Sequence, residues 1–145
     1  MIHVDRSALV GYSAEAMYAL ADDIESYPQF LPWCDGAEYA AREPGRTVAT
    51  LHINFRGLKS QFTTENVHQP GKRIDMRLVS GPFRSLEGSW SFADLRNDAS
   101  KIEFSLRYEF ASPLLEAAVG PVFRRITETF VDAFVRRADE KFGRK

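Results

Sequence analysis

The fold of this chain is decided by residues 101–113, which read KIEFSLRYEFASP. From Ile102 to Phe110 every second residue is large and apolar, and charged or polar residues stand between them. This period of two predicts a strand with one buried face and one solvated face. Ser112 and Pro113 then supply a helix N-cap followed by proline at the first helical position. The segment therefore predicts a half-buried strand that leads directly into a helix.

The helix after Ser112 is predicted to run to about Phe142. Its spacing places an apolar stripe along one side, formed by Leu115, Val119, Val122, Ile126, Phe130, Ala133 and Phe134. Gly120 and Pro121 fall inside the helix, so a kink or a break is expected there. A stripe of this length needs a large apolar surface to cover it. The helix is therefore expected to pack against the apolar face of a sheet.

The same period of two extends back to residue 36. Turn sequences at 43–45, 55–57, 69–71 and 97–100 separate the runs. Short turns between such runs predict an antiparallel meander of six strands over residues 36–110. The positions that share a face are Thr47, Ala49, Leu51, Ile53 and Phe55, then Leu58, Ser60, Phe62, Thr64 and Asn66, then Ile74, Met76 and Leu78, and finally Leu86, Gly88, Trp90 and Phe92.

Residues 2–10 are predicted to form one further strand. Ser13 is a candidate N-cap for a helix through about Ser26, after which Pro28 and Pro32 allow at most a short helical turn. The order of elements is a strand, one or two helices, six strands and a long helix. The predicted fold class is therefore α+β, with a curved antiparallel sheet wrapped around the C-terminal helix.

The length and charge of the chain limit its possible roles. At 145 residues it is expected to form one domain, spanning 1–145. A formal net charge of −1 argues against broad electrostatic binding to nucleic acid, and no DNA partner is expected. The N-terminus lacks a secretory signal, and no run of about 18 apolar residues is present. We expect a cytoplasmic protein whose contact with the inner membrane, if any, is peripheral.

Two irregular apolar segments indicate function. Residues 27–34 read YPQFLPWC, and the two prolines prevent a continuing helix or central strand pairing. Residues 81–92 read GPFRSLEGSWSF and are also rich in apolar and aromatic side chains. Segments this apolar must be covered by the protein or must themselves cover something. They predict loops that roof an apolar interior, and hence an apolar ligand.

These two segments, together with the helix after Ser112-Pro113, resemble the coenzyme Q-binding protein family. This family belongs to the START-like superfamily of polyketide cyclases and lipid transport proteins, and its bacterial members include ribosome association toxins. The resemblance covers essentially the whole chain. It implies the helix-grip fold, with a seven-stranded sheet and an apolar tunnel between sheet and helix. It also implies that ubiquinone or a related polyprenyl lipid is the ligand, in support of respiration and with no required cofactor.

The candidate ligand-binding residues follow from this resemblance and from the strand pattern. The rim is expected at Tyr27, Phe30, Leu31, Pro32 and Trp33. The walls are expected at Met76, Leu78, Phe83, Leu86, Trp90, Phe92, Leu106 and Tyr108 of the sheet, and at Leu115, Val119, Val122 and Phe123 of the helix. The alternative for both sets is ordinary core packing, because protein interiors are packed to crystal-like density.

Two further expectations concern the shape and polarity of this interior. Gly88 and the Gly120-Pro121 step are places where the gap between helix and sheet is expected to widen. Trp90 and Tyr108 carry polar groups that can hydrogen-bond to a carbonyl ligand such as a quinone.

Histidine and cysteine offer no further site in the sequence. His3, His52 and His68 have no spacing that brings two of them onto one face beside a carboxylate, so no metal site is predicted. All three are expected at the surface or at a strand edge. Cys34 precedes Asp35 and is expected to be a buried structural thiol, since a reactive thiolate needs a cationic neighbour or a helix N-terminus.

Arginine pairs occur in the last helix at Arg124-Arg125 and Arg136-Arg137, with Arg144-Lys145 beyond them. Acidic residues are interspersed among them, which is typical of a solvated helix face whose cationic end suits the helix dipole. The alternative is a docking patch for anionic lipid headgroups or ribosomal RNA.

The preferred function is that of a carrier or chaperone for a hydrophobic small molecule, which makes and breaks no bond. The second hypothesis is an aromatase or cyclase for a poly-β-ketone, which needs a positioned acid and base, with Tyr108 and Arg6 as the inward-facing polar candidates. The third is association with the large ribosomal subunit through the arginine pairs. No catalytic triad, phosphate-binding loop, dinucleotide fingerprint or paired-carboxylate motif is present, so no enzyme activity is predicted.

Overall fold

Seven antiparallel strands form one sheet in the computed structural model, which describes residues 1–96 and 98–143. The strand order is β1-β7-β6-β5-β4-β3-β2. The elements are β1 (Ile2–Val10), α1 (Ala14–Asp22), the 3-10 helix η1 (Ile24–Gln29), β2 (Cys34–Glu43), β3 (Arg46–Phe55), β4 (Leu58–Gln69), β5 (Arg73–Ser80), β6 (Phe83–Asp94), β7 (Ser100–Phe110) and α2 (Pro113–Phe142). The α+β class, the six-strand meander and the long last helix are confirmed. Asn97 of the predicted turn and the pair Arg144-Lys145 lie outside the described residues.

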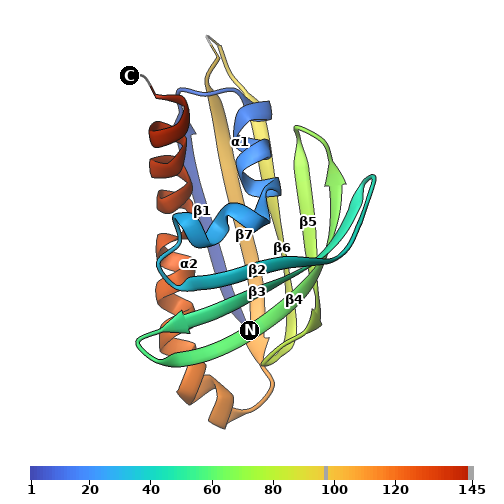
Figure 1. Ribbon diagram of the computed structural model, residues 1–145, viewed down its shortest axis with the longest axis vertical. Coiled ribbons are helices and arrows are strands. Elements are labelled where there is room, and N and C mark those ends of the chain that lie inside the picture. Colours follow the sequence, from blue (N-terminus) through green and yellow to red (C-terminus); the bar gives the residue numbers. More distant parts are fainter. Residues whose placement is uncertain (97, 144–145) are drawn as a thin grey trace.

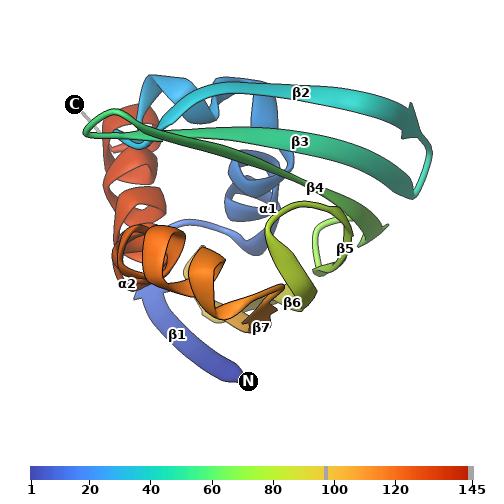
Figure 2. The same cartoon turned by 90° about the horizontal axis from the view of Figure 1, so that it is seen from below.

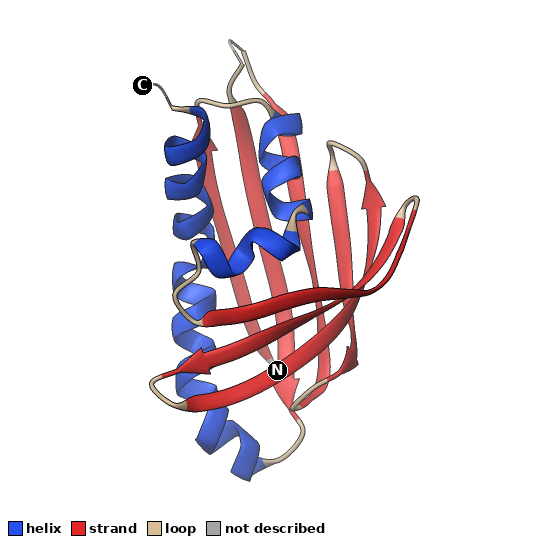
Figure 3. Ribbon diagram, viewed as in Figure 1, coloured by secondary structure: helices blue, strands red, loops and turns tan. Residues whose placement is uncertain are grey.

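The sheet is strongly curved and encloses the helices on its concave side (Figure 1 and Figure 3). In Figure 2, β2, β3 and β4 lie along one side and β6, β7 and β1 along the other, with β5 at the turn between them. Register shifts at Cys34/Gly36, Tyr39/Ala41, Thr63/Thr64 and Phe83/Ser85 contribute to this curvature, because a bulge bends its strand and increases the local twist. The helices α1 and α2 contact the sheet on this concave side.

The first helix is shorter than its apolar pattern predicts. Ser13 caps α1 as expected, and its hydroxyl accepts a hydrogen bond from the Ala16 amide at 3.1 Å. The α-helix ends at Asp22, however, and the chain continues as η1 with Pro28 inside it. Proline lacks an N–H and disfavours the α conformation of the preceding residue, so the tighter 3-10 turn replaces the α-helix here. The predicted extension to Ser26 is wrong, whereas the short turn at Pro28 is present.

The last helix begins as predicted and does not break. The Ser112 hydroxyl accepts a hydrogen bond from the Leu115 amide at 3.1 Å, and Pro113 is the first helical residue. The helix continues through Gly120 and Pro121, so the predicted break is absent. Figure 2 shows the first turns of α2 running at an angle to the rest, as expected of a bend at a helical proline. Although α2 has 30 residues, none of the described helices is both long and apolar enough to cross a membrane.

Two clusters of aromatic rings fill much of the space between α2 and the sheet. One surrounds Phe130 and Phe134, whose ring centroids lie 5.0 Å from those of Phe104 and Trp90 respectively. The other surrounds Phe123, whose ring lies 4.9 Å from that of Phe83 and 4.8 Å from that of Tyr108. Of the predicted wall residues of α2, Phe123 and Val119 are buried, whereas Val122 and Leu115 are only half-buried.

Gly88 brings two strands together and does not widen the gap between helix and sheet. A Cβ atom at this position would lie 2.6 Å from the Ser105 carbonyl oxygen and 2.8 Å from Cδ1 of Leu106. Only glycine permits so close an approach of β7 to β6. The prediction that Gly88 creates space is wrong, because the missing side chain is used by the neighbouring strand.

Candidate functional site

A cavity of about 90 Å³ lies between the concave face of the sheet, the end of α1 with η1, and α2. Most of its lining is apolar or aromatic, and the polar exceptions are concentrated on β3 and β4. The lining consists of Ala21, Asp22, Ile24, Tyr27, Trp33, Thr47, Ala49, Leu51, Phe62, Thr64, Asn66, His68, Ile74, Met76, Leu86, Trp90, Phe104, Leu106, Phe123, Ile126, Thr127 and Phe130.

Aromatic rings form the part of the lining next to α2. Phe130 lies among them, with its ring centroid 5.0 Å from that of Phe104, 5.6 Å from that of Trp90 and 6.3 Å from that of Trp33. These rings are tilted relative to Phe130, an arrangement that avoids the unfavourable face-to-face sandwich. The result is a rigid apolar surface suited to a flat or apolar ligand.

Of the two segments predicted to form roof loops, residues 81–92 belong mostly to β6, so the prediction is wrong for that segment: its apolar side chains alternate along a regular strand. The other, residues 27–34, spans the end of η1 and the start of β2; we call it the roof segment, and it is anchored to the structure around it. The buried Tyr27 hydroxyl donates a hydrogen bond to the Ala21 carbonyl oxygen at 2.5 Å, and burial raises the pKa of Tyr27 well above its usual value. The Trp33 carbonyl oxygen accepts a hydrogen bond from the Asn54 amide of β3 at 2.8 Å. Tyr27 and Trp33 thus reach the cavity from a fixed backbone.

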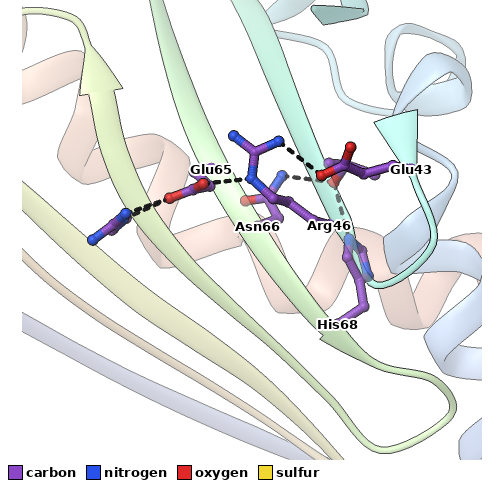
Figure 4. Close-up of polar contacts among 7 residues, drawn as sticks. Glu43, Arg46, Glu65, Asn66 and His68 are labelled. Carbon is purple, nitrogen blue, oxygen red and sulfur yellow. Dashed lines mark hydrogen bonds and ion pairs between the residues drawn. The ribbon is translucent and has the colours of Figure 1, made fainter. Parts of the chain in front are cut away.

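Four polar side chains form a continuous part of the lining, which we call the polar wall: Thr47, Thr64, Asn66 and His68. Thr64 donates a hydrogen bond to Oδ1 of Asn66 at 2.9 Å, and Nδ2 of Asn66 donates to Oγ1 of Thr47 at 3.3 Å. Oγ1 of Thr47 lies 2.9 Å from Nε2 of His68. Figure 4 shows Asn66 and His68 as sticks, with a dashed line from each to a neighbouring side chain. All four side chains are buried, so the polar wall is a hydrogen-bonded chain inside an otherwise apolar space.

His68 continues this chain toward α1. Its Nδ1 lies 2.9 Å from the Tyr18 hydroxyl oxygen and 3.7 Å from the Asp22 carboxylate. Burial lowers the pKa of His68 below 6.5, an effect that Asp22 opposes and Arg42 reinforces. The ring is therefore neutral at pH 7, with one nitrogen as donor and the other as acceptor. Burial and the Asp22 charge raise the pKa of Tyr18 to about 12, so that its hydroxyl keeps the proton.

Ion pairs occupy the outer face of the same strands (Figure 4). Nε of Arg46 lies 2.6 Å and Nη2 of Arg77 lies 2.7 Å from the Glu65 carboxylate. The two guanidinium groups lower the pKa of Glu65 below 4.5. Because side chains alternate along a strand, these charges lie on the opposite face from the polar wall.

The structure brings seven of the predicted ligand-binding residues to the cavity: Tyr27, Trp33, Met76, Leu86, Trp90, Leu106 and Phe123. It places ten outside the lining: Phe30, Leu31, Pro32, Leu78, Phe83, Phe92, Tyr108, Leu115, Val119 and Val122. Most of these ten pack in the core beside the cavity, as Phe83 does against Phe110 and Phe92 against Trp90. They lie mainly toward the ends of their elements, where neighbouring side chains fill the space.

The acid and base suggested for cyclase chemistry are not brought together. Tyr108 is buried beside Phe83 and Phe123, outside the lining. Burial raises its pKa, and a hydrogen bond with Thr127 opposes that rise. Arg6 is exposed, and its guanidinium donates to the Asp5 carbonyl oxygen at 3.2 Å. The prediction that Arg6 faces inward is wrong, because its charged group reaches water from the edge strand.

The histidine prediction is wrong for one of its three residues. The His68 side chain is 7% exposed and lines the cavity, whereas His52 is partly exposed and lies 3.0 Å from the Glu38 carboxylate. His3 is exposed. Cys34 is buried, and burial raises the pKa of its thiol above 9.0. Within residues 1–96 and 98–143, no group of three or more His, Cys, Asp or Glu side chains is arranged to hold a metal ion.

The arginines of α2 differ from one another. Arg124, Arg125 and Arg136 are exposed. Arg137 donates a hydrogen bond to Oε1 of Gln29 at 2.8 Å, and its guanidinium lies 5.2 Å from the centroid of the Phe30 ring. Arg137 therefore links the roof segment to α2, whereas the other three arginines have no such contact among the described residues.

The polar wall was missed as a site, although the strand pattern contained its signal. The predicted strand faces include Thr47, Thr64 and Asn66, and the face formed by Leu58, Ser60, Phe62, Thr64 and Asn66 carries both polar and apolar side chains. His68 lies two positions beyond Asn66 and so shares its face. A run of polar side chains on an inward face was the available sign of a polar patch in the interior.

Comparison with known proteins places these features in context. A family profile described as "Polyketide cyclase / dehydrase and lipid transport" matches residues 10–135. The chain is 42% identical over 143 residues to a Vibrio cholerae protein named ribosome association toxin RatA, with 99% of each chain covered. It is 27% identical over 148 residues to a Xenopus laevis protein named coenzyme Q-binding protein COQ10 homolog B, mitochondrial, with 99% of this chain and 61% of that protein covered.

A solved structure supports the fold. The crystal structure of the Zhui aromatase/cyclase from a Streptomyces species matches with a TM-score of 0.86, covering 98% of this chain and 96% of that one. At 16% sequence identity, this likeness concerns the fold alone.

Proposed function

Because this chain belongs to the polyketide cyclase/dehydrase and lipid transport family, we propose that it binds and carries a hydrophobic small molecule in the cavity between its sheet and α2. The observation that carries the proposal is an interior cavity with a largely aromatic and apolar lining. Ligand sites are mostly apolar, with a few polar groups that fix orientation, and this cavity has both kinds of surface. The role requires no chemical step and no cofactor.

We propose ubiquinone or a related polyprenyl lipid as the ligand, in support of respiration. The sequence motifs suggest it, and a relative that aligns with 99% of this chain is named a coenzyme Q-binding protein. A quinone ring is flat and apolar on its faces, which suits the rings around Phe130, and its carbonyl oxygens need hydrogen-bond donors. The proposed place of action is the cytoplasm, with the inner membrane as the source of ligand.

The size of the cavity determines how such a ligand would be held. At about 90 Å³ it is smaller than the roughly 300–1,000 Å³ of typical ligand pockets, so binding requires side chains to move apart. Met76 and Phe62 are only half-buried, and the unbranched Met76 side chain adapts readily. We propose that the ring occupies the widened cavity, while a long tail protrudes or stays in the bilayer.

Native mass spectrometry and lipid extraction test this proposal, after expression in a host that produces quinone. Bound quinone is expected with the wild type and less with Ala49→Leu, which adds bulk to the lining. Ala37→Leu is the matched control, because Ala37 is half-buried on β2 and outside the lining. Recovery of empty wild-type protein that also fails to bind added quinone would overturn the proposal.

Association with the large ribosomal subunit is a second candidate function. A relative 42% identical to this chain is named ribosome association toxin RatA, and Arg124 and Arg125 are exposed on α2. Contacts with RNA phosphates would weaken as salt concentration rises. Co-sedimentation with large subunits should therefore fall with salt and with the double change Arg124→Gln, Arg125→Gln. The control is Arg84→Gln, Arg107→Gln on β6 and β7, and equal loss in both pairs would contradict a specific α2 patch.

A further inference from the structure

The polar wall contains more hydrogen-bond donors than its own contacts use. The four side chains of the polar wall and the Tyr18 hydroxyl together carry six polar hydrogens. Asn66 has two, and each of the other four, including the neutral His68 ring, has one. They share four hydrogen bonds: Tyr18 with His68, His68 with Thr47, Asn66 with Thr47, and Thr64 with Asn66. Each bond uses one hydrogen, so two hydrogens are left over.

One of these hydrogens belongs to Asn66. Its amide nitrogen carries two hydrogens and donates one of them, to Thr47. Reversing the amide would direct one hydrogen to Thr64 instead and would still leave the other unused. The residue is 7% exposed, and no described residue accepts the second hydrogen. A buried N–H without a partner is costly, whereas spare lone pairs on oxygen are better tolerated.

The second hydrogen belongs to a hydroxyl beside His68. If Nε2 of His68 carries the ring proton and donates it to Thr47, the Thr47 hydroxyl hydrogen is unused. If Nδ1 carries the ring proton, the Tyr18 hydroxyl hydrogen is unused instead. Either tautomer therefore leaves Asn66 with a spare hydrogen in the polar wall. The Nε2 tautomer adds a second one there, on Thr47, whereas in the Nδ1 tautomer the second one is on Tyr18, outside the lining.

From this we infer that the polar wall binds a carbonyl oxygen of the ligand, with Asn66 as the principal donor. The inference rests on the proposed function and adds the chemistry of the head group and its orientation. The carbonyl end of the ligand faces β3 and β4, and the apolar remainder lies against the rings around Phe130.

The same wall selects against an anionic head group. The Asp22 carboxylate is part of the lining and lies 3.7 Å from the neutral His68 ring. The lining contains no arginine or lysine among the described residues. A carboxylate ligand would meet like charge without a cation in the lining to pair with it, so the ligand class is a neutral carbonyl compound such as a quinone, ketone or ester.

Three small probes with the same number of carbon atoms separate these possibilities. Hexanophenone carries a carbonyl beside a phenyl ring, hexylbenzene has the same carbon skeleton without it, and 4-pentylbenzoate is anionic. In isothermal titration calorimetry, the wild type should bind hexanophenone at least as tightly as hexylbenzene. Without a hydrogen bond from the protein, hexanophenone would bind more weakly, because water solvates the ketone better. Binding of 4-pentylbenzoate should be more than about 10-fold weaker, since the cost of an unpaired buried charge exceeds that of a neutral group.

The Asn66→Leu variant should bind hexanophenone about 5- to 30-fold more weakly, because the buried carbonyl loses its donor. Its affinity for hexylbenzene should stay within about threefold. Thr64→Val, which removes the hydrogen bond that positions Asn66, should weaken ketone binding in the same direction. Thr63→Val is the matched control, since the adjacent Thr63 is also buried and hydrogen-bonded, to Thr50, but lies outside the lining.

A spectroscopic readout makes the test independent of whether these variants fold. The side-chain amide signals of Asn66 in the wild type should shift on addition of hexanophenone and stay nearly unchanged with hexylbenzene. Equal shifts with both probes, or equal loss of both affinities in an Asn66→Leu protein whose circular dichroism spectrum matches that of the wild type, would overturn the inference and leave the proposed function standing. Binding of neither probe by the wild type would overturn both.

Discussion

Replacing Phe130 with alanine is expected to destabilise the protein by about 4 kcal/mol while enlarging the space available to a ligand. The Phe130 side chain is 9% exposed, and its ring lies within 6.4 Å of five other aromatic rings. Loss of the ring without collapse adds on the order of 100 Å³ of empty space, which at about 24 cal/mol per Å³ costs roughly 2.4 kcal/mol. The lost transfer free energy of the ring adds about 2 kcal/mol.

The change also increases the cavity from about 90 Å³ to roughly 190 Å³ if its neighbours hold their places. Hexylbenzene should then raise the melting temperature of Phe130→Ala more than that of the wild type, because a ligand that binds the folded state stabilises it. Urea unfolding followed by circular dichroism measures the first effect, and thermal unfolding with and without hexylbenzene measures the second.

Phe142→Ala is the matched control for this experiment. Phe142 lies on the same helix, but it is 40% exposed and its ring packs against Tyr12 at the surface. Its loss should cost less than about 1 kcal/mol and leave the response to hexylbenzene unchanged. A cost below about 1.5 kcal/mol for Phe130→Ala, or an equal hexylbenzene response in both variants, would refute the reasoning, because Phe130 would then not support the cavity wall.

Gly88→Ala should lower stability by about 1–3 kcal/mol, because its Cβ would lie 2.6 Å from the backbone oxygen of β7. Gly11→Ala, with open space around it, is the control in thermal unfolding, and equal effects would contradict the close approach of the strands. Glu65→Gln should remove stability that the wild type has at neutral pH. Since the pKa of Glu65 is lowered below 4.5, that advantage should disappear in urea unfolding as the pH falls through the folded-state value; a pH-independent difference would argue against it. His68 should titrate below pH 6.5 by NMR, and stability should fall as the pH drops from 6.5 toward that midpoint, because the unfolded chain binds the proton more readily. A midpoint at or above 6.5 would show that Asp22 outweighs burial.

The fold could be predicted from the sequence wherever a short segment determines its own structure. The alternation over 102–110 and the cap at Ser112 are local patterns, and both β7 and the start of α2 match them. The errors lie where a distant segment intervenes. The role of Gly88 depends on how closely β7 approaches, and no feature of β6 alone reveals that distance.

The candidate site was less predictable, because the face of a strand does not determine which of its residues borders a hollow. Trp90 and Phe92 share one face of β6, yet Trp90 lines the cavity and Phe92 does not, since Phe92 packs between Trp90 and Tyr18. The polar wall could have been found from the polar residues on an inward face. Its hydrogen-bond order, in contrast, requires the pairing of Thr47 with Asn66 across β3 and β4.

Ordinary core packing is the alternative to a ligand site. It accounts for the buried residues around the cavity, but it does not account for the cavity. Leaving a space of about 90 Å³ unfilled would cost on the order of 2 kcal/mol relative to a filled core. An unpartnered donor such as the Asn66 amide adds a desolvation cost of about 1–3 kcal/mol. A leucine or valine at one or two positions of β3 and β4 would remove both costs. A cavity and an unpartnered donor beside the same strands are unfavourable in a core, whereas a site that binds an amphipathic molecule needs both. This is the strongest structural reason to prefer the carrier function.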